Sequence, residues 1–182
     1  MRNSILTAVI LFFAVSCISF SQVKLAFVDS EIIIKQLPEA QEVQKKLEEI
    51  QKQYYDTINT KESEIKKKAD EFKSKYEEAQ KQVQSGSLKP DQITALESEI
   101  SAMQTDLQKM DQDLTEYKQS ANQSFASTQV EMFKPIKEKI TKVIEQVAKE
   151  LKYNMVLDKA SDSLIYGDKD LDITFKVLDK MK

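Results

Sequence analysis

The sequence predicts a mainly α protein with a small β-containing body, built around one long antiparallel hairpin of two helices. Three observations carry this prediction. The 182 residues include only two Gly and three Pro, which suits long uninterrupted helices. Apolar residues recur at helical spacing through the middle of the chain. Strand-like segments occur only near its two ends, so the ends must meet and the helices must fold back between them.

The N-terminus has the pattern of a secretory signal. Ile5–Val15 is an apolar run too short to span a bilayer as a stable helix, and small residues follow it. We therefore predict a signal peptide over residues 1–21, with an N-terminal anchor or buried helix as the weaker alternatives. A minor alternative is lipidation of Cys17, because residues 14–17 loosely resemble a lipobox.

Composition excludes several classes of function. Removing residues 1–21 takes away one basic and no acidic residue, which leaves a net charge of −4. That charge disfavours a nucleic-acid partner and leaves only weak membrane association open. The chain has no His, which removes the commonest general base and metal ligand. We predict neither an enzyme nor a bound cofactor or metal, and most carboxylates are expected in solvated i,i+4 pairs with Lys.

The first element of the mature chain is a predicted strand. Val23–Asp29 places apolar side chains on both faces, as in a strand covered on both sides. Ser30 is the expected N-cap of a short helix over Glu31–Gln36. Pro38 then disfavours helix at the residue before it and can open a new one.

Two long helices are predicted to form the hairpin. The outgoing helix covers about Glu39–Gln84, roughly 70 Å at 1.5 Å per residue. The breaker cluster 85–91 is its tip. The return helix carries an apolar stripe at alternating steps of three and four, a strong coiled-coil pattern. Pro135 is expected to kink or break it, giving a distal part up to Phe133 and a proximal part up to Leu151. The stripe comprises Ile93, Leu96, Ile100, Met103, Leu107, Met110, Leu114, Tyr117 and Ala121.

The C-terminal segment changes character. Residues 153–158 and Leu164–Tyr166 are predicted strands, and Asp172 is expected to cap a last helix over 173–181. We therefore expect a discontinuous body from 22–38 and 134–182, and a hairpin over 39–133.

The order of these features resembles the Skp/OmpH family of periplasmic chaperones. No single motif is specific, and their order and spacing over the mature chain carry the resemblance. The matching features are Leu25-Ala26-Phe27-Val28-Asp29, Pro38, Pro135-Ile136 with Ile140, Val143-Ile144 and Val147-Ala148, Tyr153 to Asp158, and Tyr166-Gly167 followed by Asp172-Ile173-Thr174 and Val177-Leu178.

The resemblance implies a homotrimer with a small β-rich body and three helical tentacles. In that family the tentacles enclose a cavity that holds unfolded outer-membrane proteins without ATP. It therefore implies a periplasmic holdase whose partners are unfolded outer-membrane β-barrel proteins. The best-known member is basic whereas this mature chain is acidic, and no basic cluster here matches lipopolysaccharide binding.

Five residues are candidates for function. Tyr55, Phe125 and Phe133 flank the apolar stripes; they either widen the hairpin seam and pack between copies, or contact clients. Lys61 and Ser120 lie where the stripes weaken on the two helices, opposite each other in a hairpin folded near residue 88. They are therefore candidate hinge positions.

Two other functions compete with the holdase. A structural or adaptor coiled coil of the cell envelope would have the same helices and no client binding. A prefoldin-like chaperone is also built on helical hairpins, but its β-hairpins lie between the long helices, whereas the strands predicted here lie at the chain ends.

Overall fold

The computed structural model describes residues 23–161 and 164–181. The predicted signal peptide and Cys17 lie outside the described residues. The chain divides into two compact units, one formed by Leu37–Ile136 and the other by the chain up to Gln36 and from Lys137 onward. The first unit is a helical hairpin and the second contains a small two-stranded sheet. The predicted fold class is confirmed.

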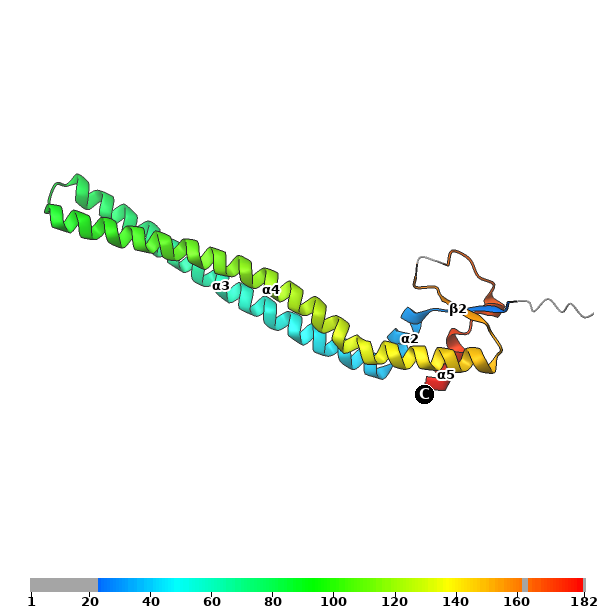
Figure 1. Cartoon of the computed structure of the whole chain (residues 1–182). Coiled ribbons are helices and arrows are strands. Elements are labelled where there is room, and N and C mark those ends of the chain that lie inside the picture. Colours follow the sequence, from blue (N-terminus) through cyan, green and yellow to red (C-terminus); the bar gives the residue numbers. More distant parts are fainter. Residues whose placement is uncertain (1–22, 162–163, 182) are drawn as a thin grey trace, which may run out of the picture. The chain divides into compact units, whose positions relative to one another are not determined.

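The hairpin consists of helix α3, Pro38–Gln84, and the part of helix α4, Pro90–Glu150, that belongs to this unit. The two helices run antiparallel and side by side (Figure 1). Ion pairs join them at two levels: Lys75 to Glu99 at 3.1 Å and Lys118 to Glu62 at 2.7 Å. Pro38 occupies the first turn of α3 after an extended Leu37, because proline suits that position and disfavours helix at the residue before it.

The hairpin tip is held by short polar contacts. Gly86 adopts a φ of +66°, a left-handed conformation that glycine reaches without the steric cost of a Cβ. The hydroxyl oxygens of Ser85 and Ser87 are hydrogen-bonded at 2.7 Å. The side-chain carbonyl of Gln92 accepts from the backbone N–H of Lys89 at 2.9 Å, which is half of a capping box at the start of α4.

The hairpin seam is only partly closed. Leu47, Ala79, Leu114 and Ala121 are buried. Most of the other apolar residues on the facing sides of α3 and α4 are half-buried, because two helices alone cannot enclose an apolar stripe on every side. The half-buried set comprises Tyr54, Ile58, Ile65, Phe72, Ile93, Leu96, Ile100, Met103, Leu107, Met110 and Tyr117.

Helix α4 is continuous through Pro135, so the predicted break between two separate helical parts is wrong. Proline removes one backbone hydrogen bond and its ring crowds the preceding turn. Here the helix continues on both sides of the proline, with buried Ile136 and Ile140 following it. Burial of such side chains contributes about 1.5–3 kcal/mol each, enough to offset a cost of about 3 kcal/mol. The boundary between the two compact units still falls directly after Ile136.

The second unit is built on two short parallel strands. Strand β1, Leu25–Val28, pairs with strand β2, Met155–Asp158, so that Leu25 lies opposite Met155 and Val28 opposite Asp158. Helix α2, Ser30–Gln36, follows β1 directly. A short 3₁₀ helix η2, Lys169–Leu171, and helix α5, Thr174–Met181, complete the unit.

The core of this unit is formed by α2, α5, the sheet and the C-terminal part of α4. Helices α2 and α5 are in contact. Ile33 of α2 and Val177 of α5 are fully buried, with Ile173 just before α5. The backbone N–H of Ile173 donates to the carbonyl of Phe27 at 2.9 Å. The buried set comprises Ala26, Phe27, Val28, Ile33, Ile140, Val147, Ile173, Thr174, Val177 and Leu178.

The structure differs from the expectation at Leu164–Tyr166 and at the start of α2. Leu164–Tyr166 is not a strand, because the second edge of β1 is already taken at Phe27 by a parallel bridge to Asp172. The cap of α2 is Asp29 rather than Ser30: the Asp29 carboxylate accepts from the backbone N–H of Ile32 at 3.0 Å. The carboxylate of Asp172 accepts from the backbone N–H of Thr174 at 2.9 Å, as expected for the start of the last helix.

Candidate functional site

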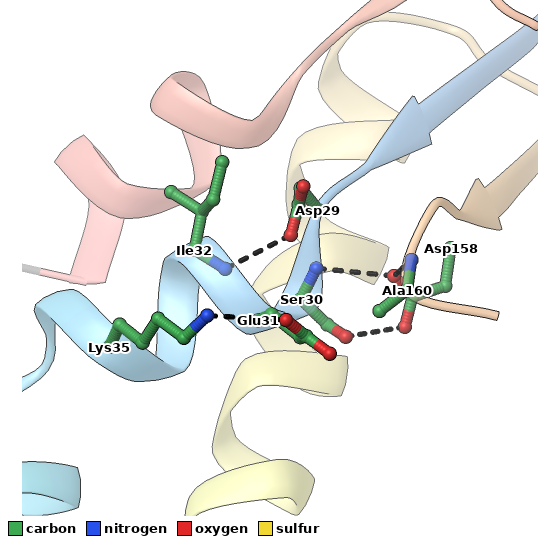
Figure 2. Close-up of polar contacts among 7 residues, drawn as sticks. All are labelled: Asp29, Ser30, Glu31, Ile32, Lys35, Asp158 and Ala160. Atoms are coloured by element: carbon green, nitrogen blue, oxygen red, sulfur yellow. Dashed lines mark hydrogen bonds and ion pairs between the residues drawn. The ribbon is translucent and has the colours of Figure 1, made fainter.

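The most connected polar group in the sheet-containing unit is the carboxylate of Asp158. One oxygen accepts from the backbone N–H groups of Ser30 at 3.1 Å and Ala160 at 3.0 Å. The other oxygen accepts from the Ser30 hydroxyl at 2.5 Å (Figure 2). The two donors of Ser30 join the start of α2 to the end of β2, and the N–H of Ala160 fixes the turn that follows β2. This aspartate therefore acts as a structural clasp between distant segments.

A second polar link joins the start of α2 to α5. The backbone N–H of Asp29 donates to the Thr174 hydroxyl oxygen at 2.9 Å, and that hydroxyl donates to the Asp172 carboxylate at 2.5 Å. Thr174 is almost fully buried, so its hydroxyl needs such partners. In both links the acidic side chains satisfy backbone and hydroxyl donors of the fold itself.

The described residues contain no group of three or more His, Cys, Asp or Glu side chains placed to hold a metal ion. On the exposed face of α3, a hydrogen bond to Asp56, together with its charge, raises the pKa of Lys52 above the ordinary value. Lys52 is four residues before Asp56 on one helix, so this pair has the expected i,i+4 spacing on a solvated face. The sequence predicts that Lys52 pairs with Glu48 and Glu62 with Lys66, whereas Glu62 pairs across the hairpin with Lys118.

The predicted contact aromatics differ in exposure. Tyr55 is 64% exposed on α3, whereas Phe125 and Phe133 on α4 are half-buried. The side chain of Tyr55 is therefore accessible to a partner, whereas the side chains of Phe125 and Phe133 are only partly accessible. The half-buried phenylalanines are placed to widen the hairpin seam. The exposed Tyr55 is placed to contact a client.

The two predicted hinge positions have different surroundings. The Lys61 ammonium lies 5.5 Å from the centroid of the Tyr117 ring, within range of a cation–π interaction. The same tyrosine makes an edge contact with Tyr54 at 6.4 Å between centroids. Ser120 is exposed. Aromatic and cationic groups therefore take the place of aliphatic side chains in the seam at this level of the hairpin.

A groove lies at the tip end of the hairpin, between α3 and α4. It has a volume of about 390 Å³. From α3 it is lined by Tyr76, Ala79, Gln80, Val83 and Gln84, and from α4 by Ile93, Leu96, Glu97, Ile100, Ser101 and Gln104. Nearer the middle of α3, a shallow hollow of about 630 Å³ is lined by Ser63, Lys66, Lys67, Asp70, Glu71, Ser74, Lys75 and Glu78.

The sheet-containing unit carries its own apolar surface. Ile165 is 99% and Tyr166 83% exposed. Together with Phe27 and Phe175 they line a hollow of about 550 Å³. Gly167 lies against the Phe27 ring so closely that a Cβ there would come within 2.5 Å of a ring carbon. Large exposed apolar side chains gathered at one hollow are typical of an interaction surface.

Sequence reasoning missed the tip groove and the Asp158 clasp. The groove has a signal in the charge pattern: twelve of the eighteen residues 61–78 are charged, whereas only five of the 27 residues 79–105 are. The clasp has none, because its partners are 128 residues apart and both residue types are common at turns and caps.

A long helical hairpin with a partly open apolar seam, together with a small parallel sheet formed by segments before and after it in the sequence, defines a mainly α class of protein. Within that class, the chain belongs to the OmpH-like outer membrane protein family, whose model matches residues 24–181. A proposed OmpH-like outer membrane chaperone from Caulobacter crescentus CB15 has a similar structure, with a TM-score of 0.63 and 16% sequence identity. The match covers 88% of this chain and 85% of that one.

No curated protein matches the sequence significantly. None of the helices in the described residues is long and apolar enough to cross a membrane.

Proposed function

We propose that this protein is an ATP-independent periplasmic holdase that binds unfolded outer-membrane β-barrel proteins in a cavity between helical hairpins and prevents their aggregation. Family membership supports the general assignment to outer-membrane chaperones. The finer assignment rests on one observation above all: the hairpin seam leaves a long apolar stripe half-exposed between charged faces.

Such a surface suits weak binding of many unrelated unfolded chains. Each half-exposed side chain can bury only a little more apolar area against a client, at about 25 cal/mol per Å². Many such contacts in one cavity raise the overall affinity through a high effective concentration. Tyr55, Phe125 and Phe133 are the proposed contacts that flank the stripe. The interleaved charges keep the unoccupied surface hydrated and soluble.

A holdase of this kind needs no nucleotide. Binding the unfolded state shifts the client away from aggregation by mass action. A client held apart from others cannot pair its exposed strand edges with theirs. No step in this mechanism breaks a covalent bond, so the lack of a predicted catalytic centre is in keeping with it.

The cavity requires more than one copy of the chain, and we propose a homotrimer. Two parallel strands of four residues each are too small a sheet to stand alone, and parallel sheets are normally covered on both faces. No other strand in the described residues pairs with the outer edge of β2. The exposed Ile165 and Tyr166 lie in the same unit. The number three comes from the family resemblance.

The test is suppression of aggregation. A urea-unfolded outer-membrane β-barrel protein is diluted into buffer with or without the mature chain, residues 22–182, and light scattering is followed in the absence of ATP. The proposal predicts suppressed scattering at a small molar excess of the chain. Unchanged scattering would leave the structural coiled coil of the cell envelope as the better account.

A further inference from the structure

The tip groove differs from the rest of the hairpin surface in its charge. Of its eleven lining residues only Glu97 is charged, whereas six of the eight residues lining the hollow on α3 are. Enclosing a charged group without a partner costs several kcal/mol. The groove is therefore suited to an uncharged occupant, and the hollow on α3 is not.

The polar groups of the groove suit a peptide backbone. The side chains of Gln80, Gln84 and Gln104 are exposed, and no hydrogen bond within the described part of the chain engages their amides. Each amide offers two donors and an acceptor. They flank half-buried Ile93 and Ile100. Amide groups beside apolar side chains complement an extended polypeptide, which presents backbone N–H and C=O groups together with its side chains.

The size of the groove favours a short extended segment over a second hairpin. On each helix the lining spans about nine to twelve residues, which is about 14–18 Å along the axis. An extended chain covers that length with about four or five residues. A helical partner would instead need several heptads of contact to form a stable coiled coil.

We propose that the tip groove binds an uncharged, apolar segment of an unfolded polypeptide in extended conformation. This inference rests on the proposed holdase function and adds a selectivity to it. Clients would be engaged at the tip through their neutral strand-like segments, and charged segments would be left to the solvated faces of the hairpin.

The test uses the full chain and a fluorescein-labelled octapeptide with blocked ends, in which Leu or Phe alternates with Gln or Thr. Fluorescence anisotropy measures its dissociation constant. Two matched peptides carry Lys or Glu at the polar positions. The neutral peptide is expected to bind at least tenfold more tightly than either charged one. Val83→Lys, which places a charge in the groove, is expected to weaken binding of the neutral peptide at least tenfold.

The matched control is Val130→Lys, which introduces the same residue at an exposed valine of α4 outside the groove. It should leave the affinity for the neutral peptide unchanged. Lys is a better helix former than Val, so neither variant should lose helicity, which circular dichroism checks. Equal binding of all three peptides, or equal losses in both variants, would overturn the proposal.

Oligomer mass and suppression of aggregation distinguish failure of the groove proposal from failure of the proposed holdase function. If Val83→Lys lowers the mass of the oligomer in sedimentation equilibrium, the groove is a contact between copies and the proposal is wrong. If the neutral peptide fails to bind while the wild-type chain still suppresses aggregation of a β-barrel protein, the groove proposal falls and the holdase stands. If aggregation is not suppressed at all, the proposed function itself fails.

Discussion

Ser30 gives both its backbone N–H and its hydroxyl to the carboxylate of Asp158, although 128 residues separate them. The two donors reach different oxygens of one carboxylate (Figure 2). One residue comes before the long hairpin in the sequence and the other after it. This clasp, together with the pairing of Val28 with Asp158, joins the segment before the hairpin to the segment after it.

Removing the clasp should loosen the start of α2. Asp158→Ala deletes three hydrogen bonds to a charged group, and each such bond contributes about 1.5–3 kcal/mol at most. We expect local opening of residues 25–33 to become about tenfold or more easier. Hydrogen exchange followed by mass spectrometry measures this in peptides covering β1 and α2. Asp170→Ala, at an exposed carboxylate, is the matched control and should leave exchange in those peptides unchanged.

A side chain at residue 167 should disturb the sheet-containing unit at Phe27 of β1. A Cβ on Gly167 would lie 2.5 Å and 2.7 Å from two carbons of the buried Phe27 ring. Because this distance is far below van der Waals contact, Gly167→Ala must displace the ring. Overpacking of this kind costs about 1–3 kcal/mol, which should speed hydrogen exchange in peptides that cover β1. Gly86→Ala, where a Cβ meets nothing within 4 Å, should leave exchange in β1 peptides unchanged despite its own strain at a positive φ.

The level of Lys61 and Ser120 should govern how far the hairpin flexes. The double variant Lys61→Leu with Ser120→Leu is designed to stiffen the hairpin at this level. The half-buried Lys61 lies near the Tyr117 ring, so leucine there adds an apolar contact to the seam. Ser120 is exposed, so leucine there stays at the surface and Ser120→Leu serves as the control. We expect Lys61→Leu, alone or in the double variant, to narrow the range of client sizes bound in pull-down and native mass measurements. An unchanged range in the double variant would remove the hinge assignment.

The exposed apolar residues of the body should hold the oligomer together. Ile165→Ser combined with Tyr166→Ser removes two large apolar side chains from the hollow beside Phe27. If that surface is buried between copies, central apolar anchors of this kind contribute about 2 kcal/mol or more each. The oligomer should then dissociate at concentrations at least tenfold higher than wild type in sedimentation equilibrium. Val130→Ser, at an exposed residue of the hairpin, is the control and should leave the mass unchanged.

Most of the fold could be predicted because it depends on local signals. The scarcity of Gly and Pro, the stripe from Ile93 to Ala121 and the breaker cluster around Gly86 are all visible in the sequence. The predictions at Pro135 and at Leu164–Tyr166 were wrong because the local structure there depends on contacts with residues distant in the sequence. The effect of Pro135 depends on whether packing on both sides sustains the helix. The fate of Leu164–Tyr166 depends on Asp172 having taken the edge of β1 at Phe27.

The surface was harder to predict than the fold. Spacing along a helix identifies which residues flank a seam, and so it found Tyr55, Phe125 and Phe133. It does not reveal which of them the partner helix covers, and their exposures differ. The tip groove is lined from both helices, with Ala79 and Val83 of α3 facing Ile93 and Ile100 of α4 across it. Its sequence signal is a local loss of charge, which is informative only once the two helices are known to meet there.

The most direct test of the central claim is the mass of the complex between the mature chain and an unfolded outer-membrane β-barrel protein. The client is diluted from urea without ATP into a small excess of the chain, and the complex is measured by light scattering coupled to size-exclusion chromatography or by native mass spectrometry. The account predicts a soluble complex of one oligomer, a trimer, with one client that is still unfolded. Aggregated client together with free oligomer, and no complex at any ratio, would contradict it.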